Sequence, residues 1–116
     1  MFPHISTSLT LSSCTVGTES TPTELVVSIA GELDMADADK VAKMLVEAAD
    51  GATPAIRIDL SALTFADSSA VKAIVLGAQA AKRRGVAYEL VNPNRRILRL
   101  LEVTGLAGAL NVVRTE

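Results

Sequence analysis

Residues 57–85, RIDLSALTFADSSAVKAIVLGAQAAKRRG, contain the pattern of a buried strand, a short loop and a long helix in direct succession. The apolar run around residues 56–60 predicts the strand, and apolar residues at helical spacing predict a helix that ends at Gly85. Between them stands an abrupt polar trio, Asp67, Ser68 and Ser69. The stretch therefore predicts an α/β fold and places a hydroxyl group at a helix start.

The position of Ser68 allows two roles. The first N–H groups of a helix have no intrahelical partner and carry partial positive charge, so they favour a nearby anion. Ser68 is accordingly either part of an ordinary helix cap or a hydroxyl group that carries a phosphate. On local pattern alone the cap is the commoner outcome, because Ser and Asp are frequent at helix starts.

Length and composition indicate one domain. The chain has 116 residues, of which 49% are hydrophobic, and this is enough to bury a core that needs no stabilising metal or disulfide bond. The formal charge of −2 argues against a nucleic-acid binder, which depends on clustered Lys and Arg. We interpret the basic runs at residues 82–84 and 95–96 as solvated helix ends, where cations suit the last turn of a helix, and not as anion sites.

Cys14 is the only cysteine, so neither an intramolecular disulfide nor a cysteine metal cluster can form, and a reducing compartment fits. Residues 11–14 superficially resemble a lipoprotein cleavage site, but the preceding residues lack the positive charge and the continuous apolar run of a signal peptide. No window approaches the roughly 20 apolar residues of a membrane span. We therefore expect a cytoplasmic protein that does not insert into a membrane.

The N-terminal third predicts a hairpin. Residues 5–16 alternate loosely between polar and apolar and predict an edge or hairpin strand, and residues 17–22 form a cluster of turn residues. Residues 23–30 predict a second strand that stops at Gly31 and pairs antiparallel with the first.

The rest of the chain alternates helices and strands. In order we expect a helix, a strand, the long helix, a strand, a helix and a last strand, over residues 36–49, 55–60, 68–85, 86–91, 93–104 and 109–113. Asn92 is the expected N-cap of the third helix, with Pro93 as its first residue. This alternation predicts βαβ crossovers. We therefore expect one α/β domain over residues 1–116, with a mixed, mostly parallel sheet, an antiparallel N-terminal strand, packed helices and a mobile segment at residues 1–4.

Catalysis finds little support. A nucleophilic Ser68 would need a base, and the only histidine, His4, lies in the N-terminal segment. Asp34, Asp59 and Asp67 lie near element ends, where α/β sheets build sites, but they are few ligands for a metal, and Asp67 is better explained as an N-cap. No glycine-rich phosphate loop follows a strand. We expect no enzymatic activity, no cofactor and no metal site.

Four segments carry a resemblance to a known family. They are Gly31 to Asp34, Ile58 to Ser61 followed by Phe65 to Ser69, Asn92-Pro93, and Thr104 to Leu106. In order and spacing they resemble the STAS-domain anti-sigma factor antagonists, over nearly the whole chain. The Asp-Ser-Ser element after the strand is the most specific of the four.

The resemblance implies a STAS-like domain and a switch in bacterial partner-switching control of transcription. Such antagonists bind an anti-sigma factor that is also a serine kinase and thereby free a sigma factor. The kinase would phosphorylate Ser68 with its own ATP and Mg²⁺ and release the antagonist, and a PP2C-type phosphatase would reverse the step. Asp34, Asp67 and Ser69 would lie on the partner-facing rim, and we add Lys72 and Leu76 from the polar side of the helix as partner contacts.

Three alternatives stay open. The family commonly has Gly after the two serines, so the methyl group of Ala70 either obstructs a close kinase approach or improves the helix. Leu76 is either a scattered surface leucine or a partner contact. The same fold could also serve as a regulatory or assembly subunit of a membrane transport system. Unpaired edge strands make a homodimer physically possible.

Overall fold

The computed structural model describes residues 5–51, 53–104 and 110–114. The described part of the chain forms one mixed sheet of seven strands and three helices, and this confirms the α/β prediction. The elements are β1 (Ile5–Thr10), β2 (Cys14–Ser20), β3 (Leu25–Leu33), α1 (Ala38–Asp50), β4 (Ala55–Asp59), β5 (Leu63–Ala66), α2 (Ser68–Arg84), β6 (Ala87–Val91), α3 (Arg95–Val103) and β7 (Asn111–Val113).

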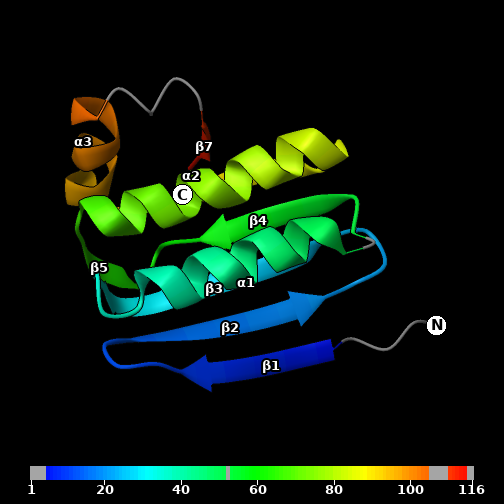
Figure 1. Cartoon of the computed structure of the whole chain (residues 1–116), viewed down its shortest axis with the longest axis horizontal. Helices are drawn as coiled ribbons and strands as arrows, with labels where there is room; N and C mark the ends of the chain where they lie inside the picture. Colours follow the sequence, from blue (N-terminus) through cyan, green and yellow to red (C-terminus); the bar gives the residue numbers. More distant parts are fainter. Residues whose placement is uncertain (1–4, 52, 105–109, 115–116) are drawn as a thin grey trace.

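The strand order is β1-β2-β3-β4-β6-β7, with β5 paired to β3 beyond the end of β4. The first two pairings are antiparallel, and β3–β4, β3–β5, β4–β6 and β6–β7 are parallel. Helices α1 and α2 lie side by side on one face of the sheet, and α3 stands at the end where α2 begins (Figure 1). The predicted mixed sheet with an antiparallel N-terminal edge is thus confirmed.

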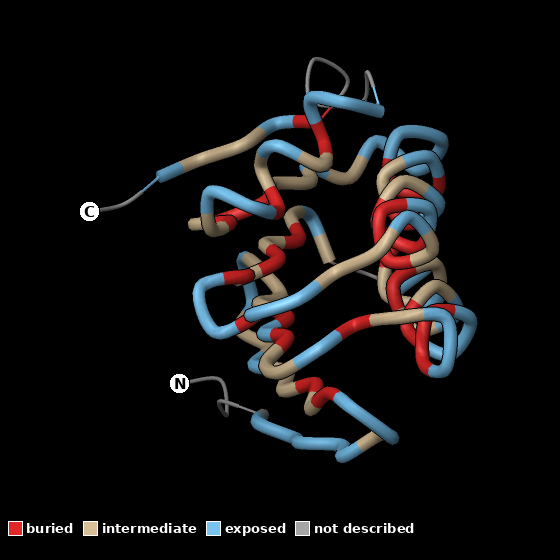
Figure 2. Tube along the Cα trace, turned by 90° about the vertical axis from the view of Figure 1, so that its left-hand side faces the viewer, coloured by how far each residue is buried: buried red, intermediate tan, exposed pale blue. Residues whose placement is uncertain are grey.

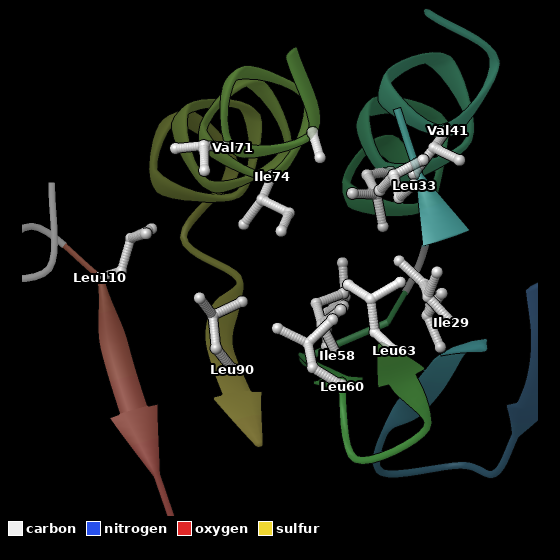
Figure 3. Close-up of a cluster of buried hydrophobic side chains, with 14 of the residues drawn as sticks. Ile29, Leu33, Val41, Ile58, Leu60, Leu63, Val71, Ile74, Leu90 and Leu110 are labelled. Carbon is white, nitrogen blue, oxygen red and sulfur yellow. The ribbon is translucent and has the colours of Figure 1, made fainter. Parts of the chain in front are cut away.

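The core fills the space between the sheet and this helix pair. Buried positions in Figure 2 gather where the strands face the helices, and the side chains in Figure 3 meet there from both layers. Removing each such aliphatic side chain from water contributes about 1.5–3 kcal/mol. The largest fully buried members include Ile29, Leu33, Leu45, Ile56, Ile58, Leu60, Leu63, Ile74, Leu90, Ile97 and Leu101.

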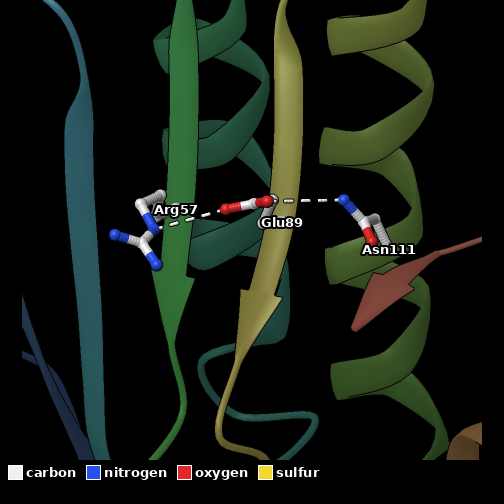
Figure 4. A network of polar contacts seen from close by, with 3 residues as sticks. All are labelled: Arg57, Glu89 and Asn111. Carbon is white, nitrogen blue, oxygen red and sulfur yellow. Dashed lines mark hydrogen bonds and ion pairs between the residues drawn. The ribbon is translucent and has the colours of Figure 1, made fainter. Parts of the chain in front are cut away.

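The other face of the sheet carries no helix among the described residues (Figure 1). On it Arg57, Glu89 and Asn111 occupy paired positions on β4, β6 and β7. The Nε of Arg57 lies 3.3 Å from Oε1 of Glu89, and Nδ2 of Asn111 donates to Oε2 of Glu89 at 3.5 Å (Figure 4). This row keeps the helix-free face compatible with water.

The N-terminal prediction was partly wrong. Residues 5–16 form two strands and not one, and β2 runs into the stretch expected to turn. The break comes at residues 11–13, where Leu11 N–H donates to the carbonyl of Cys14 at 2.8 Å. The N–H groups of Ser12 and Ser13 donate to the buried carboxylate of Asp37, a contact from a distant helix start that local pattern cannot reveal.

The loop expected before Asp67 contains the extra strand β5, and β3 does not stop at Gly31. Gly31 has φ of +94°, which favours glycine, and the register of the β3–β5 pair shifts between Gly31 and Glu32. The chain therefore continues past Gly31 on an altered path and pairs with β5.

The start of the third helix was also misplaced. Asn94, and not Asn92, is the N-cap of α3, because its Oδ1 accepts from Ile97 N–H at 2.9 Å. Asn92 has a positive φ of 53°, and α3 begins only at Arg95. The side-chain amide of Asn94 also donates to the carbonyl of Leu63 at 3.0 Å, which ties α3 to β5.

One basic run lies at the opposite end of its helix from the end that its interpretation assumed. Lys82, Arg83 and Arg84 lie in the last turn of α2, as predicted. Arg95 and Arg96 instead lie in the first turn of α3, where the helix dipole disfavours cations, so their interpretation as favourable helix-end charges was wrong. The expected mobile segment at residues 1–4 and the Gly105-Leu106 part of the resemblance lie outside the described residues.

Candidate functional site

The pairing of β3 with β5 brings two distant motifs together. Leu33 pairs with Ala66, so Asp34 and Asp67, the next residue of each segment, emerge at the same end of the sheet. Asp67 N–H donates to the carbonyl of Leu33 at 3.3 Å, and Met35 N–H donates to Oδ2 of Asp67 at 3.2 Å across 32 residues. The segments 31–35 and 65–69 therefore lie side by side at the start of α2 (Figure 1).

Asp67 fixes the first turn of α2, as the sequence predicted. Its Oδ1 accepts from Ala70 N–H at 3.0 Å and from the hydroxyl of Ser69 at 2.6 Å. Burial alone would raise the pKa of Asp67, but the hydrogen bonds from Ser69, Ala70 and Met35 outweigh it and hold that pKa below its ordinary value. Asp67 therefore stays ionised near neutral pH and serves as a structural anion.

Ser68 is the first residue of α2 and is exposed. Within the described ranges no protein group hydrogen-bonds to its hydroxyl, whereas the neighbouring Ser69 hydroxyl is held by Asp67. The two serines thus differ in availability. Of the pair, Ser68 is the one that an incoming enzyme could reach without first breaking a hydrogen bond.

Ala70 faces inward. Its side chain is fully buried in the core. The methyl group is therefore absent from the surface around Ser68 and adds contacts to the interior, where it also suits a helix better than Gly by about 1 kcal/mol. Of the two interpretations of Ala70, the packing favours the improved helix.

The other residues expected at the rim fall into two groups. Asp34 is half-buried, and its Oδ1 accepts from Ala36 N–H at 3.0 Å, which shapes the turn before α1. Lys72 and Leu76 are exposed and follow Ser68 at intervals of four, so the three form one stripe along α2. The predicted exposure of Leu76 is confirmed at 38%.

Sequence reasoning missed two exposed apolar side chains at this end. Met35 is 79% exposed and follows Asp34 directly, and Phe65 is 45% exposed and precedes Asp67 by two residues. Single exposed apolar residues are ordinary, but Met35 and Phe65 lie on the two segments that β3–β5 pairing joins before α2, and Leu76 lies two turns along α2 from Ser68. Their only sequence signal is a large apolar residue beside turn and cap residues. We call this surface the Ser68 rim, formed by Asp34, Met35, Phe65, Asp67, Ser68, Ser69, Lys72 and Leu76.

The chemistry available at the Ser68 rim is that of an acceptor and a contact surface. The described residues include no histidine and no group of three or more side chains that could hold a metal ion. Asp59, the third carboxylate considered, accepts from the N–H and hydroxyl of Ser61 at 2.9 and 2.7 Å, which accounts for it as a turn residue. Among the described helices none is long and apolar enough to cross a membrane.

A family model described as Mlab, STAS domain matches residues 16–114. The chain belongs to the STAS-domain family. The match covers every element from β3 to β7, including both segments of the Ser68 rim, and confirms the resemblance seen in the sequence. It leaves out β1, which precedes residue 16.

Relatives of this STAS domain include the anti-sigma-B factor antagonist of Bacillus subtilis, 29% identical over 89 residues, which make up 77% of this chain and 81% of the relative. The structure resembles an anti-sigma factor antagonist from Mycobacterium paratuberculosis, with a TM-score of 0.79, 26% identity and coverage of 89% and 87%. It also resembles the antagonist SpoIIAA in its unphosphorylated form, with a TM-score of 0.75, 21% identity and coverage of 87% and 88%.

The same fold occurs in a much larger protein. The STAS domain here covers 83% of its own length but only 19% of SLC26A9, with a TM-score of 0.71 and 14% identity. At this identity the likeness is one of fold alone.

Proposed function

We propose that this STAS domain is an anti-sigma factor antagonist, a non-enzymatic cytoplasmic protein that binds an anti-sigma factor with serine kinase activity through the Ser68 rim. The observation that carries the proposal is the exposed hydroxyl of Ser68 at the start of α2, which no described residue hydrogen-bonds, on a rim that also exposes Met35, Phe65 and Leu76. Relatives named as anti-sigma factor antagonists support the class of function.

Phosphorylation of Ser68 is the proposed switch. The partner transfers the γ-phosphoryl group of ATP to the Ser68 hydroxyl oxygen, ADP leaves, and the hydroxyl proton passes to a base of the kinase. SpoIIAA, a structural relative, has also been solved in a phosphorylated form. A PP2C-type phosphatase would return Ser68 to its free state.

The surroundings of Ser68 explain why a phosphate would release the partner. It adds about −1.5 to −2 charges directly after the ionised Asp67, on a rim that exposes the apolar side chains of Met35, Phe65 and Leu76. Burying that charge against a partner is costly unless it is paired. Asp67 already occupies the Ala70 N–H and the Ser69 hydroxyl, so fewer donors at the helix start remain for the phosphate.

The switch is tested by incubating the protein with ATP, Mg²⁺ and each anti-sigma kinase of the same genome, followed by phosphopeptide mass spectrometry. We expect phosphate on Ser68 and none on Ser69, whose hydroxyl is engaged by Asp67. Ser68→Ala should abolish labelling but retain binding. Absence of phosphate from Ser68 with every kinase would refute the switch.

Binding is tested separately by isothermal titration with the purified anti-sigma factor. Ser68→Glu should weaken binding at least tenfold, whereas Ser28→Glu, which adds the same charge to the helix-free face, should not. Met35→Ala and Phe65→Ala should each weaken binding by about 1–3 kcal/mol if they are anchors, with unchanged melting temperatures. Equal affinities for all four variants and wild type would exclude the Ser68 rim as the contact surface.

The transport alternative rests on fold likeness alone. SLC26A9 contains a similar domain, but 14% identity assigns no residue of this chain to transport. A protein captured by wild type but not by Ser68→Glu identifies the partner class directly, and a transporter subunit in that position would favour the alternative.

A further inference from the structure

The strand β1 stands apart from the rest of this STAS domain. It precedes the family match, which begins at residue 16, and contributes no residue to the Ser68 rim. It pairs with β2 on one side only and ends the strand order, so its outer row of N–H and C=O groups has no partner strand among the described residues. Figure 2 shows it as a continuous exposed segment at the lower margin, away from the helices.

The amino-acid composition of β1 leaves its free edge able to pair with another strand. Natural edge strands are commonly protected by charge, proline, a bulge or a covering element. Residues 5–10, ISTSLT, contain no charged residue and no proline, and all six pair with β2 in an unbroken register. Residues 6–10 are all exposed, and Leu9, on the side of the sheet that carries the helices, is 48% exposed because neither α1 nor α2 reaches over β1.

The edge is also self-complementary. Two copies of β1 related by a two-fold axis run antiparallel, and every register sets an uncharged side chain opposite another uncharged one, so like-charge repulsion is absent. The opposite edge of the sheet is a poorer partner. Strand β7 has only three residues and is followed by the exposed Arg114. Pairing of β1 with β7 of another copy would therefore form fewer hydrogen bonds than pairing of β1 with β1.

We propose that this protein forms a homodimer through antiparallel pairing of β1 with β1 of a second copy. The turn after β1 is bound to Asp37 at the start of α1, so the Ser68 rim lies near the C-terminal end of β1. Antiparallel pairing puts the two rims at opposite ends of the dimer. Each copy then presents its own Ser68 rim, and the dimer is independent of the state of Ser68.

Sedimentation equilibrium on the full chain tests the dimer, in a concentration series up to the solubility limit. The wild-type average mass should rise from 12.1 kDa toward twice that value. Ser8→Lys places a charge from each copy at the edge and should hold the protein at the monomer mass. The matched control is Ser28→Lys, since Ser8, Gly17 and Ser28 form one row across three strands and Ser28 is two strands inside the edge. The control should dimerise like wild type.

A wild-type protein that stays monomeric throughout would overturn the proposal, and so would a Ser28→Lys variant that is as monomeric as Ser8→Lys, because the helix-free face would then be the interface. If Ser8→Lys fails to fold by circular dichroism, cross-linking decides instead. Ser8→Cys should form a disulfide-linked dimer with copper phenanthroline and oxygen as oxidant, and Ser28→Cys should not. The native Cys14 does not interfere, because it is only 3% exposed. The same test on Ser6→Cys, Thr7→Cys and Thr10→Cys covers the other registers, because only the residue on the two-fold axis faces its own copy. Absence of cross-linking at all four β1 positions would refute the pairing.

Discussion

The buried carboxylate of Asp37 accepts a hydrogen bond of 2.8 Å from the backbone N–H of Ser13, which stands 24 residues earlier. A second bond of 3.1 Å comes from the N–H of Ser12. Asp37 occupies the N-cap position of α1 but makes no side-chain cap bond to that helix. Its carboxylate instead satisfies the turn between β1 and β2 and fastens this turn to the start of α1.

Replacement of Asp37 by Ala should destabilise the protein, because two backbone N–H groups lose their acceptor. We expect the thermal midpoint to fall by roughly 5–10 °C, measured by circular dichroism. Asp39→Ala is the matched control, since Asp39 lies in the same first turn but is exposed. Equal effects of the two substitutions would mean that Asp37 acts only on the helix dipole.

Acid should weaken the same contact. The hydrogen bonds from Ser13 and Ser12 outweigh burial and hold the pKa of Asp37 below its ordinary value of 3.8, and that of Asp67 is lowered as well. A carboxyl group whose pKa is lower in the folded state stabilises fully above 3.8, and this contribution disappears as pH falls through the folded-state pKa. Urea titrations between about pH 7 and pH 2 should show a wild-type advantage over Asp37→Asn that shrinks below about pH 4. A difference in the free energy of unfolding that does not change with pH would contradict a stabilising role of the ionised Asp37 carboxylate.

Close packing of α1, α2 and β6 predicts a penalty at Gly77. A Cβ atom there would lie 2.6 Å from the hydroxyl oxygen of Tyr88 and 2.8 Å from Cβ of Leu45. Gly77→Ala should therefore lower the free energy of unfolding by about 1–3 kcal/mol, although alanine favours helices. Urea unfolding in a Tyr88→Phe background should show a smaller loss, because the hydroxyl group is gone. The same loss in both backgrounds would assign the effect to Leu45 alone.

The two basic runs should respond with opposite signs. Arg96 lies in the first turn of α3 and Arg83 in the last turn of α2, and both are exposed. Arg96→Glu should raise the free energy of unfolding and Arg83→Glu should lower it, each by about 0.3–1 kcal/mol. The two variants have equal net charge, so each controls for the other in urea unfolding at low salt. If both substitutions changed the free energy of unfolding in the same direction, the overall charge of the protein, and not the helix dipole, would be the cause.

Much of the site could be predicted because its signals are local. Asp67 caps α2 through the N–H of a residue three positions later, and the exposure of Leu76 follows from helical periodicity. Met35 and Phe65 could not be assigned to the site in this way. Their place at the same end of the sheet comes from the β3–β5 pairing, which joins segments more than 30 residues apart.

The sequence by itself determined the alternation of strands and helices, the position of α2 and the hydroxyl group at its start, because hydrophobic period and capping act within one or two turns of chain. Only the tertiary structure decided where the N-terminal segment turns, that β5 exists, that α3 begins at Arg95 and that Ala70 faces the core. Each of these depends on a contact with a distant partner, such as Asp37 with Ser13 or Asn94 with Leu63. Such contacts form only when the sheet has assembled, so no local pattern encodes them.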